Sequence, residues 1–219
     1  ETADLGIALD GDADRVVFSD ENGDLIDCDQ ILGVLAKNLL SQNLLKNDTI
    51  VGTFMTNLGL ETYLKSLNLN LKRVNVGDRY ILDEMISNGY NLGGEPSGHV
   101  IISDHAKSGD GLLTAIKILS LLKKSGLKAS EFLRPFKIIP YRVENVPGLK
   151  EDLLQNSNVS NQLEKYAHEL RKDYNGRLLV RQSGTEPIVR ILVECDKKIV
   201  IDSFISKISN FLLSKNNIS

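Results

Sequence analysis

The chain has 219 residues, 42% of them hydrophobic, with a formal net charge of −3 and a pI near 5.7. This length accommodates one large domain or two modest domains, each with its own core. Acidic and basic residues are interspersed and no basic patch stands out, so we expect no nucleic acid and no membrane as a partner.

No apolar run approaches the length of a membrane span, and no segment resembles a signal peptide. Cys28 and Cys195 stand alone in the sequence, which argues against a disulfide framework or a zinc site. We expect both to be buried, reduced thiols of a cytoplasmic protein. The chain begins without Met and close to a predicted strand, so we expect it to be the C-terminal part of a longer protein.

In chain order, the first predicted elements are two short strands, residues 4–9 and 16–19, on either side of an acidic loop. Asn22-Gly23 is typical of a hairpin turn and leads into residues 25–26. Apolar periodicity then predicts helices over 29–40, 58–67, 78–86 and 112–122. It predicts strands over 49–53, 71–76, 91–94 and 100–103. Thr56 or Asn57 is the expected N-cap of the second helix, and Ser108-Gly109-Asp110-Gly111 opens the fourth. Asp78 either caps its helix or takes part in binding.

Gly126 and Pro135 mark a change of composition, which places a domain boundary near residues 135–140. The pattern beyond it predicts a strand over 136–143, a helix over 161–172, strands over 177–181 and 188–194, and a final helix that ends at Leu213. The predicted fold class is therefore α/β, in three parts. These are the end of a metal-loop domain (1–27), one complete α/β mixed-sheet domain (28–135), and a C-terminal α+β domain with an antiparallel sheet (136–219).

The acidic loop Asp10-Gly11-Asp12-Ala13-Asp14-Arg15 places three carboxylates at alternate positions. Carboxylate oxygens are hard ligands suited to Mg²⁺, Mn²⁺ or Ca²⁺, and a cation removes the repulsion between them. Arg15 adds a fixed positive charge beside such a metal. We therefore predict a site for Mg²⁺ formed by Asp10, Asp12 and Asp14.

The acidic loop allows two other interpretations. Most clusters of surface aspartates are solvated loops without a ligand. An EF-hand is also suggested, because Asp10, Asp12, Asp14 and Glu21 fall at its first, third, fifth and twelfth positions. The EF-hand requires glycine where Arg15 stands, and it requires flanking helices where the sequence predicts strands.

A second polar loop, Gly93-Gly94-Glu95-Pro96-Ser97-Gly98-His99, lies between two predicted strands. Glu95 can accept hydrogen bonds and Ser97 can donate or accept them, which suits the neighbouring hydroxyls of a sugar. His99 can transfer a proton near neutral pH. On these residues alone, a structural turn with a structural histidine explains the loop equally well.

The third loop is Arg181-Gln182-Ser183-Gly184-Thr185-Glu186-Pro187, with Arg190 following in the next strand. Two guanidinium groups, two hydroxyls and a glycine N–H can form a phosphate cradle, since the arginine fork matches phosphate oxygens. The alternative is a polar hairpin turn in which Arg190 pairs with Glu186 or Glu194.

In this order and spacing, the three loops resemble those of the α-D-phosphohexomutase superfamily. Asp-Gly-Asp-Ala-Asp-Arg resembles its metal loop, Gly-Glu-Pro-Ser-Gly-His its sugar-binding loop, and Arg-Gln-Ser-Gly-Thr-Glu-Pro its phosphate-binding loop. Val76-Gly77-Asp78-Arg79-Tyr80 and Ser108-Gly109-Asp110-Gly111-Leu112-Leu113 look like the bacterial branch that acts on glucosamine phosphates. The resemblance extends from the start of the chain to about Glu194.

The resemblance implies a four-domain cytoplasmic isomerase of cell-wall amino-sugar synthesis. It would move phosphate between the 6- and 1-positions of glucosamine through a phosphoserine and a bisphosphorylated sugar, and a homodimer is compatible with it. It implies Mg²⁺ on Asp10, Asp12 and Asp14, with Arg15 beside the transferring group and His99 as a candidate for proton transfer. Glu95 and Ser97 would bind sugar hydroxyls. The non-reacting phosphate would be held by Arg181, Ser183, Gly184, Thr185 and Arg190.

Two departures from the superfamily pattern matter. Pro96 stands where Gln or Met is expected in the sugar loop. The phosphoserine loop Thr-Ala-Ser-His-Asn-Pro does not occur in the sequence, so we expect this chain alone to be inactive as a mutase. Two alternatives remain open: a phosphomannomutase or phosphoglucomutase of the same superfamily, and a non-catalytic module that binds sugar phosphates.

Overall fold

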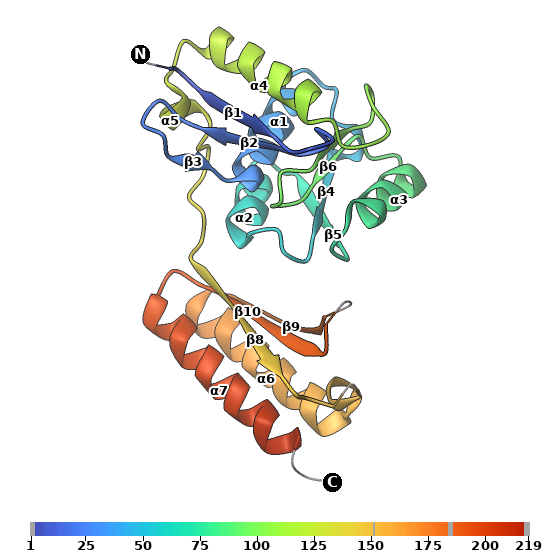
Figure 1. The fold of residues 1–219 in the computed structure, drawn as a ribbon, viewed down its shortest axis with the longest axis vertical. Coiled ribbons are helices and arrows are strands. Elements are labelled where there is room, and N and C mark those ends of the chain that lie inside the picture. The colour runs from blue at the N-terminus through green and yellow to red at the C-terminus, as the bar shows by residue number, and fades with distance from the viewer. Residues whose placement is uncertain (1–2, 151, 184–185, 217–219) are drawn as a thin grey trace. The chain divides into compact units, whose positions relative to one another are not determined.

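The computed structural model describes residues 3–150, 152–183 and 186–216, and the chain divides into two compact units, Glu1–Ile138 and Ile139–Ser219 (Figure 1). Each unit has its own hydrophobic core, and each is described by itself. The finer division of the first unit at residues 27 and 28 stays a prediction.

The first unit begins with an antiparallel sheet in the order β1-β2-β3, formed by β1 (Gly6–Leu9), β2 (Val16–Ser19) and β3 (Leu25–Ile26). The predicted hairpin turn is confirmed, because Gly23 donates to Asp20 O at 3.0 Å and has a φ of 86°. Val16, Phe18 and Ile26 are buried in the core of the unit, so the loop between β1 and β2 stands on a well-packed base.

A mixed sheet forms the centre of the first unit, in the order β5-β4-β6-β7. β4 pairs in parallel with β5 and β6, whereas β7 runs antiparallel to β6, which confirms the predicted mixed sheet. Its strands are β4 (Thr49–Thr53), β5 (Asn70–Val74), β6 (Leu92–Gly94) and β7 (Val100–Ile102).

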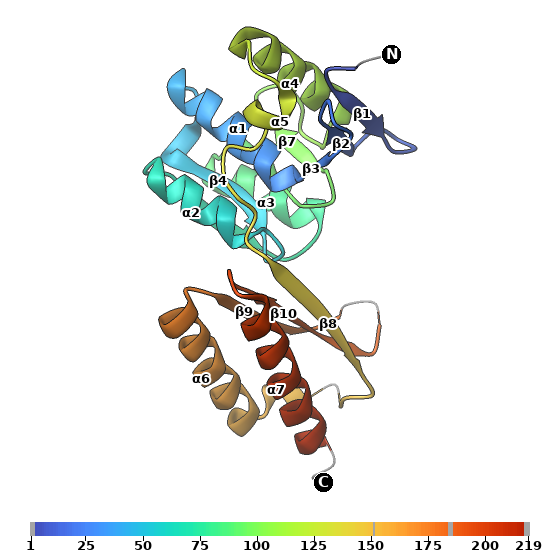
Figure 2. The ribbon, with the colours of Figure 1, turned by 90° about the vertical axis from the view of Figure 1, so that its left-hand side faces the viewer.

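Helices cover both faces of this sheet (Figure 2). Ile50 and Leu92 belong to the large core that α1, α2 and α4 share, whereas Val51 and Ile101 pack against α3. The helical segments are α1 (Cys28–Ser41), η1 (Lys46–Asp48), α2 (Leu58–Ser66), α3 (Asp78–Asn88), α4 (Gly111–Ser125) and α5 (Ala129–Phe132). None of the described helices is both long and apolar enough to cross a bilayer.

The helix starts follow local chemistry. The side chain of Asn57 accepts from Gly59 N at the start of α2, and that of Asp110 accepts from Leu113 N at the start of α4. Of the two roles considered for Asp78, that of helix cap is contradicted by the structure. The N-cap of α3 is Gly77, whose φ of 131° favours glycine, and Asp78 lies in the first turn instead.

The second unit is an antiparallel sheet in the order β8-β10-β9, with α6 and α7 packed on one of its faces (Figure 1). Its elements are β8 (Tyr141–Pro147), η2 (Leu153–Gln155), α6 (Ser157–Tyr174), β9 (Arg177–Gln182), β10 (Ile188–Glu194) and α7 (Lys198–Asn216). This confirms the predicted α+β fold with an antiparallel sheet.

Two boundaries of the second unit differ from the prediction. The strand expected over 136–143 begins at Tyr141, because Pro140 has no N–H to donate. Phe136 still belongs to the first unit, where it stacks on Tyr63 with ring centroids 5.2 Å apart. The helix expected over 161–172 begins at Ser157, because Asn156 caps it and Val159 is buried in its first turn.

Both cysteines are buried and free, as predicted, Cys28 in the first unit and Cys195 in the second. Burial, together with the nearby charges of Asp29 and Asp27, raises the pKa of the Cys28 thiol.

The Asn156 cap supplies a test of the second unit. Its side chain accepts from Asn158 N at 2.9 Å, so Asn156→Ala should lower the free energy of unfolding by about 1 kcal/mol. Asn161→Ala, on an exposed position of the same helix, should raise it by about 0.5 kcal/mol, since alanine has the higher helix propensity. Urea unfolding followed by circular dichroism measures both, and a loss of equal size in the two variants would contradict the cap.

The turn after β2 supplies a second test. Burial alone would raise the pKa of Asp20, but hydrogen bonds from Arg134 and from the N–H groups of Asn22 and Asp24 outweigh it and lower that pKa. A lowered pKa in the folded state stabilises the fold above about pH 4, and this stabilisation is lost as the pH falls towards the lowered value.

Arg134→Met should therefore reduce the free energy of unfolding most at pH 7, and the difference from the unmodified chain should shrink below about pH 4. Urea unfolding at several pH values measures this. Arg79→Met is the control, because Arg79 is exposed and lies 3.7 Å from an exposed Asp83. A difference for Arg134→Met that does not change with pH would contradict the role of the ion pair.

Candidate functional site

The acidic loop forms a tight turn between β1 and β2. Ala13 N donates to Asp10 O at 3.2 Å, and Ala13 itself adopts a left-handed φ of 59°. One carboxylate oxygen from each of Asp10, Asp12 and Asp14 lies within 4.8 Å of the other two. The structure thus gathers the three side chains that the sequence predicts as metal ligands, and the flanking elements are strands, which excludes the EF-hand.

Arg15 neutralises part of this cluster. Its backbone N–H donates to Asp10 Oδ1 at 3.2 Å and its Nε donates to Asp10 Oδ2 at 2.7 Å. Burial alone would raise the pKa of Asp10, but these contacts with Arg15 outweigh it and lower that pKa. The same Nε lies 3.5 Å from Asp14 Oδ1, so one guanidinium group faces two of the three carboxylates.

The donor set fits a hard divalent cation. The three side chains offer only oxygen atoms, and among the described residues Asp14 Oδ1 is buried without a hydrogen-bond partner. A buried carboxylate oxygen without a partner is costly unless a cation or a donor meets it. Magnesium takes a few protein oxygens and keeps other positions for water or substrate phosphate, which is compatible with a site of three aspartates.

The sugar loop is joined directly to the acidic loop. Val16 N donates to Gly98 O at 3.1 Å, and Arg15 and His99 form an isolated β-bridge. At this junction Nδ1 of His99 lies 3.2 Å from Oδ2 of Asp14. Two of the three predicted loops therefore form one continuous polar region within the first unit.

The sugar loop closes on itself and presents its polar side chains outward. Glu95 N donates to His99 O at 3.0 Å, and Gly98 N donates to Glu95 O at 3.2 Å. The Ser97 hydroxyl donates to Glu95 Oε1 at 2.7 Å, at an exposed position. Glu95 and Ser97 are thus placed side by side as hydrogen-bonding groups, whereas His99 is turned inward and is 4% exposed.

The start of α4 also contacts the acidic loop, which sequence reasoning missed. Gly111 N donates to Ala13 O at 2.8 Å, and a Cβ on Gly111 would lie only 2.8 Å from Arg15 O. A Cβ on Gly109 would lie 2.2 Å from Cε1 of His99. The Gly-x-Gly spacing before α4 was the available signal, because two glycines beside a cap indicate close backbone approach.

In the second unit, Arg181 of β9 and Arg190 of β10 are directly opposite each other in the antiparallel pair. Their side chains therefore share a face of the sheet, where two like charges repel. Burial, and then the charge of Arg190, lowers the pKa of Arg181. Such a pair of cations is stabilised by an anion between or beside them.

Several donors of this region have no hydrogen-bond partner among the described residues. They are Arg181 Nε, Arg190 Nε and the Ser183 hydroxyl, all buried. Arg190 also pairs with Glu186, Nη2 to Oε2 at 2.8 Å, as the plainer interpretation of this hairpin predicts, whereas Glu194 pairs with Arg177. Gly184 and Thr185, which were predicted as phosphate ligands, lie outside the described residues.

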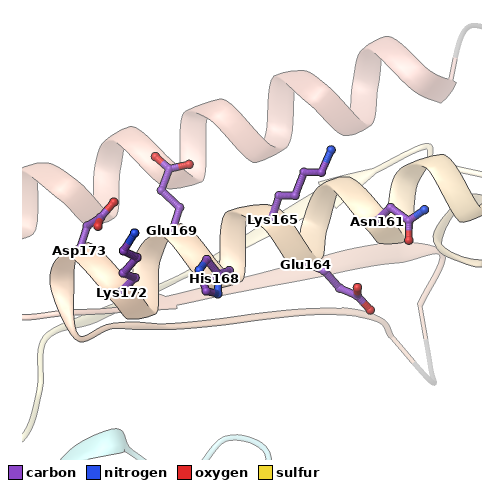
Figure 3. Close-up of a pocket in the computed structure, with 7 residues that line it drawn as sticks. All are labelled: Asn161, Glu164, Lys165, His168, Glu169, Lys172 and Asp173. Carbon is purple, nitrogen blue, oxygen red and sulfur yellow. The ribbon is translucent and has the colours of Figure 1, made fainter.

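A shallow hollow elsewhere on the second unit contains none of the predicted site residues. Figure 3 shows its side chains spread along α6 rather than converging on one point. Acidic and basic groups alternate there, and Glu169 is already paired with Lys207 at 2.9 Å. This face is a solvated helix surface, and it does not compete with the loops as a binding site.

Comparison with known proteins identifies the two units. Residues 27–137 match the family model described as phosphoglucomutase/phosphomannomutase, alpha/beta/alpha domain III. Residues 141–208 match the model described as phosphoglucomutase/phosphomannomutase, C-terminal domain. Together they cover most of the described chain, and they confirm the resemblance inferred from the three loops.

Individual relatives agree with the family models. The chain is 48% identical over 198 residues to a phosphoglucosamine mutase of Dictyoglomus turgidum, with 89% of this chain and 43% of that protein covered. It is 44% identical over 207 residues to a phosphoglucosamine mutase of Dinoroseobacter shibae, covering 94% of this chain and 46% of that protein. The chain thus spans less than half the length of these relatives.

The fold has counterparts among solved structures. The crystal structure of Aspergillus fumigatus N-acetylphosphoglucosamine mutase in complex with GlcNAc-6P and magnesium matches with a TM-score of 0.78 at 20% identity, over 99% of this chain and 50% of that one. At 20% identity, this similarity shows that the two chains share a fold. By its motifs, its two domain matches and its relatives, the chain belongs to the phosphoglucomutase/phosphomannomutase family.

Proposed function

We propose that this chain is the C-terminal part of a phosphoglucosamine mutase, which interconverts glucosamine 6-phosphate and glucosamine 1-phosphate. The observation that carries the proposal is the gathering of Asp10, Asp12 and Asp14 within 4.8 Å of one another, directly beside the sugar loop. Support comes from relatives of that name at 44% and 48% identity.

In this proposal Asp10, Asp12 and Asp14 hold Mg²⁺, which when bound neutralises the charge that develops during phosphoryl transfer. Arg15 adds a guanidinium charge that does not titrate near neutral pH, at a place fixed by its two bonds to Asp10. Its remaining N–H groups are available to the oxygens of the transferring phosphoryl group.

Glu95 and Ser97 would bind the sugar. Their side chains already meet at 2.7 Å, so the carboxylate and the hydroxyl are oriented before substrate arrives. A partly exposed acceptor beside a group that both donates and accepts suits neighbouring ring hydroxyls in either orientation of the hexose.

The phosphate that does not react would be held by Arg181, Ser183 and Arg190, with Gly184 and Thr185. The unpartnered donors on Arg181, Arg190 and Ser183 support this assignment, as does the lowered pKa of Arg181. A phosphate would remove the repulsion between the two arginines and accept bonds from their forked N–H groups.

The nucleophile of the reaction would be a phosphoserine, and the corresponding loop is absent from these 219 residues. The isolated chain should bind metal and sugar phosphate without turnover, because charge stabilisation without a nucleophile leaves no acceptor for the phosphoryl group. The intact protein would act on a phosphorylated amino sugar in the cytoplasm, as part of peptidoglycan precursor synthesis, and a homodimer is compatible with this.

Two other functions compete with this proposal. A phosphomannomutase or phosphoglucomutase is the first, since the family model carries both names. A non-catalytic module that binds sugar phosphates is the second, since the described loops have the groups needed for binding. The experiments below separate them.

Binding of inorganic phosphate tests the arginine pair. Arg181→Gln should weaken binding by about 10- to 100-fold, because a hydrogen bond to a charged group contributes about 1.5–3 kcal/mol. Calorimetry or NMR titration of the purified chain measures the affinity. Arg142→Gln is the matched control, since Arg142 lies in the same sheet but is already bonded to Glu144 and Asp202. Equal weakening in both variants would argue against a cradle.

A chimaera tests the catalytic assignment. This chain would replace the matching C-terminal part of the Dictyoglomus turgidum relative, and conversion of glucosamine, mannose and glucose 6-phosphates would be compared. We expect glucosamine 6-phosphate to react fastest, the isolated chain to show no turnover, and Asp12→Asn to lower the rate of the chimaera by at least about 100-fold.

Faster conversion of mannose or glucose phosphate would favour the first alternative. A folded chimaera that binds glucosamine 6-phosphate without turnover would favour the binding module. Far-UV circular dichroism and the melting temperature serve as the control for folding in each case.

A further inference from the structure

The buried histidine of the sugar loop makes one side-chain contact with the acidic loop. Nδ1 of His99 lies 3.2 Å from Oδ2 of Asp14, and His99 is 4% exposed. An ionised carboxylate can only accept hydrogen bonds, so in the contact with an ionised Asp14 the donor is Nδ1. The contact joins residues that are 85 positions apart in the sequence.

The backbone of His99 is held in place. Its carbonyl accepts from Glu95 N at 3.0 Å, and the preceding Gly98 carbonyl accepts from Val16 N at 3.1 Å. The β-bridge between Arg15 and His99 aligns the two segments at this point. The imidazole therefore approaches Asp14 from a fixed direction.

The ring also lies close to Gly109. A Cβ added to Gly109 would lie 2.2 Å from Cε1, 2.5 Å from Nε2 and 2.6 Å from Nδ1 of His99. Among the described residues, Nε2 is buried and has no hydrogen-bond partner. Gly109 thus lies close against the ring, where a side chain would collide with it.

These contacts leave Asp14 with two different oxygens. Oδ2 faces the histidine, whereas Oδ1 is buried without a hydrogen-bond partner in the described part of the chain, 3.5 Å from Arg15 Nε. A carboxylate bound at one oxygen has lost the freedom to rotate. Oδ1 is left as the oxygen available to a cation.

We propose that His99 is a positioning residue, which orients the Asp14 carboxylate towards the metal through Nδ1 and which has room for its ring because position 109 is glycine. The inference rests on the metal site of the proposed function, and it assigns to His99 a role other than proton transfer. Hydrogen-bond partners of metal ligands contribute about 10- to 100-fold in metal affinity, because they hold the ligand in its binding orientation.

Two substitutions of His99 separate the roles. The amide nitrogen of asparagine is as many bonds from Cβ as Nδ1, whereas that of glutamine matches Nε2. His99→Asn should therefore keep most of the affinity for Mn²⁺, and His99→Gln should lose about tenfold or more. Mn²⁺ serves as the probe, its binding to the purified chain is measured by electron paramagnetic resonance, and the readout does not depend on turnover.

Gly109→Ala supplies an independent variant that keeps the histidine. The added methyl group would displace the ring, so the affinity for Mn²⁺ should fall although no polar group is removed. His105→Gln is the matched control, because His105 is an exposed histidine that contacts Lys117 and lies outside the acidic cluster. Its affinity for Mn²⁺ should equal that of the unmodified chain, and melting temperatures show whether each variant folds.

The relative Mn²⁺ affinities of the two His99 variants decide whether His99 positions Asp14. Glutamine fills more of the histidine volume than asparagine, so equal or tighter Mn²⁺ binding by His99→Gln would mean that His99 only fills space, and the proposal would be overturned. Absence of Mn²⁺ binding by the unmodified chain, or binding unaffected by Asp12→Asn, would overturn the metal site and this inference with it. The phosphate experiment on Arg181 would still stand, so the two failures are distinguishable.

Discussion

Mutual repulsion between Asp10, Asp12 and Asp14 is the constraint to which the first unit is adapted. A turn that holds three carboxylates within 4.8 Å is unfavourable unless the surrounding structure compensates their repulsion. The packed hairpin of β1 and β2 provides a rigid base, and Arg15 provides a compensating charge at 2.7 Å from Asp10. The sugar loop and the start of α4 then close the turn through backbone hydrogen bonds to Val16 and Ala13.

The sugar loop and the start of α4 are joined to the acidic loop mainly by backbone contacts, which has a chemical advantage. A side chain that holds the turn in place cannot also bind a substrate, whereas a hydrogen bond between backbone groups leaves the side chains free. Glycine at positions 98, 109 and 111 permits the approach, because an added Cβ at each would lie 2.8 Å or less from a neighbouring atom. The polar side chains Glu95 and Ser97 remain at the surface of the loop.

Local sequence signals predicted most of the fold, since the caps, the hairpin and the apolar periodicity of α1, α2 and α4 act within a few residues. The start of α6 was missed because Ser157 and Asn158 are poor helix formers, and only the Asn156 cap and the burial of Val159 fix it. The three loops were found from their residue types. The contact between His99 and Asp14 was not, because it depends on β6 and β7 bringing distant segments together.

The reactivity of the two thiols can report the transient opening of each unit. Each compact unit contains one buried, free cysteine, Cys28 in the first and Cys195 in the second. Because Cys195 is 1% exposed and Cys28 is 8% exposed, a sulfhydryl reagent reaches either group much faster when the surrounding packing opens. Peptide mass spectrometry distinguishes the two positions. Their alkylation rates would thus show whether the two units open together or independently.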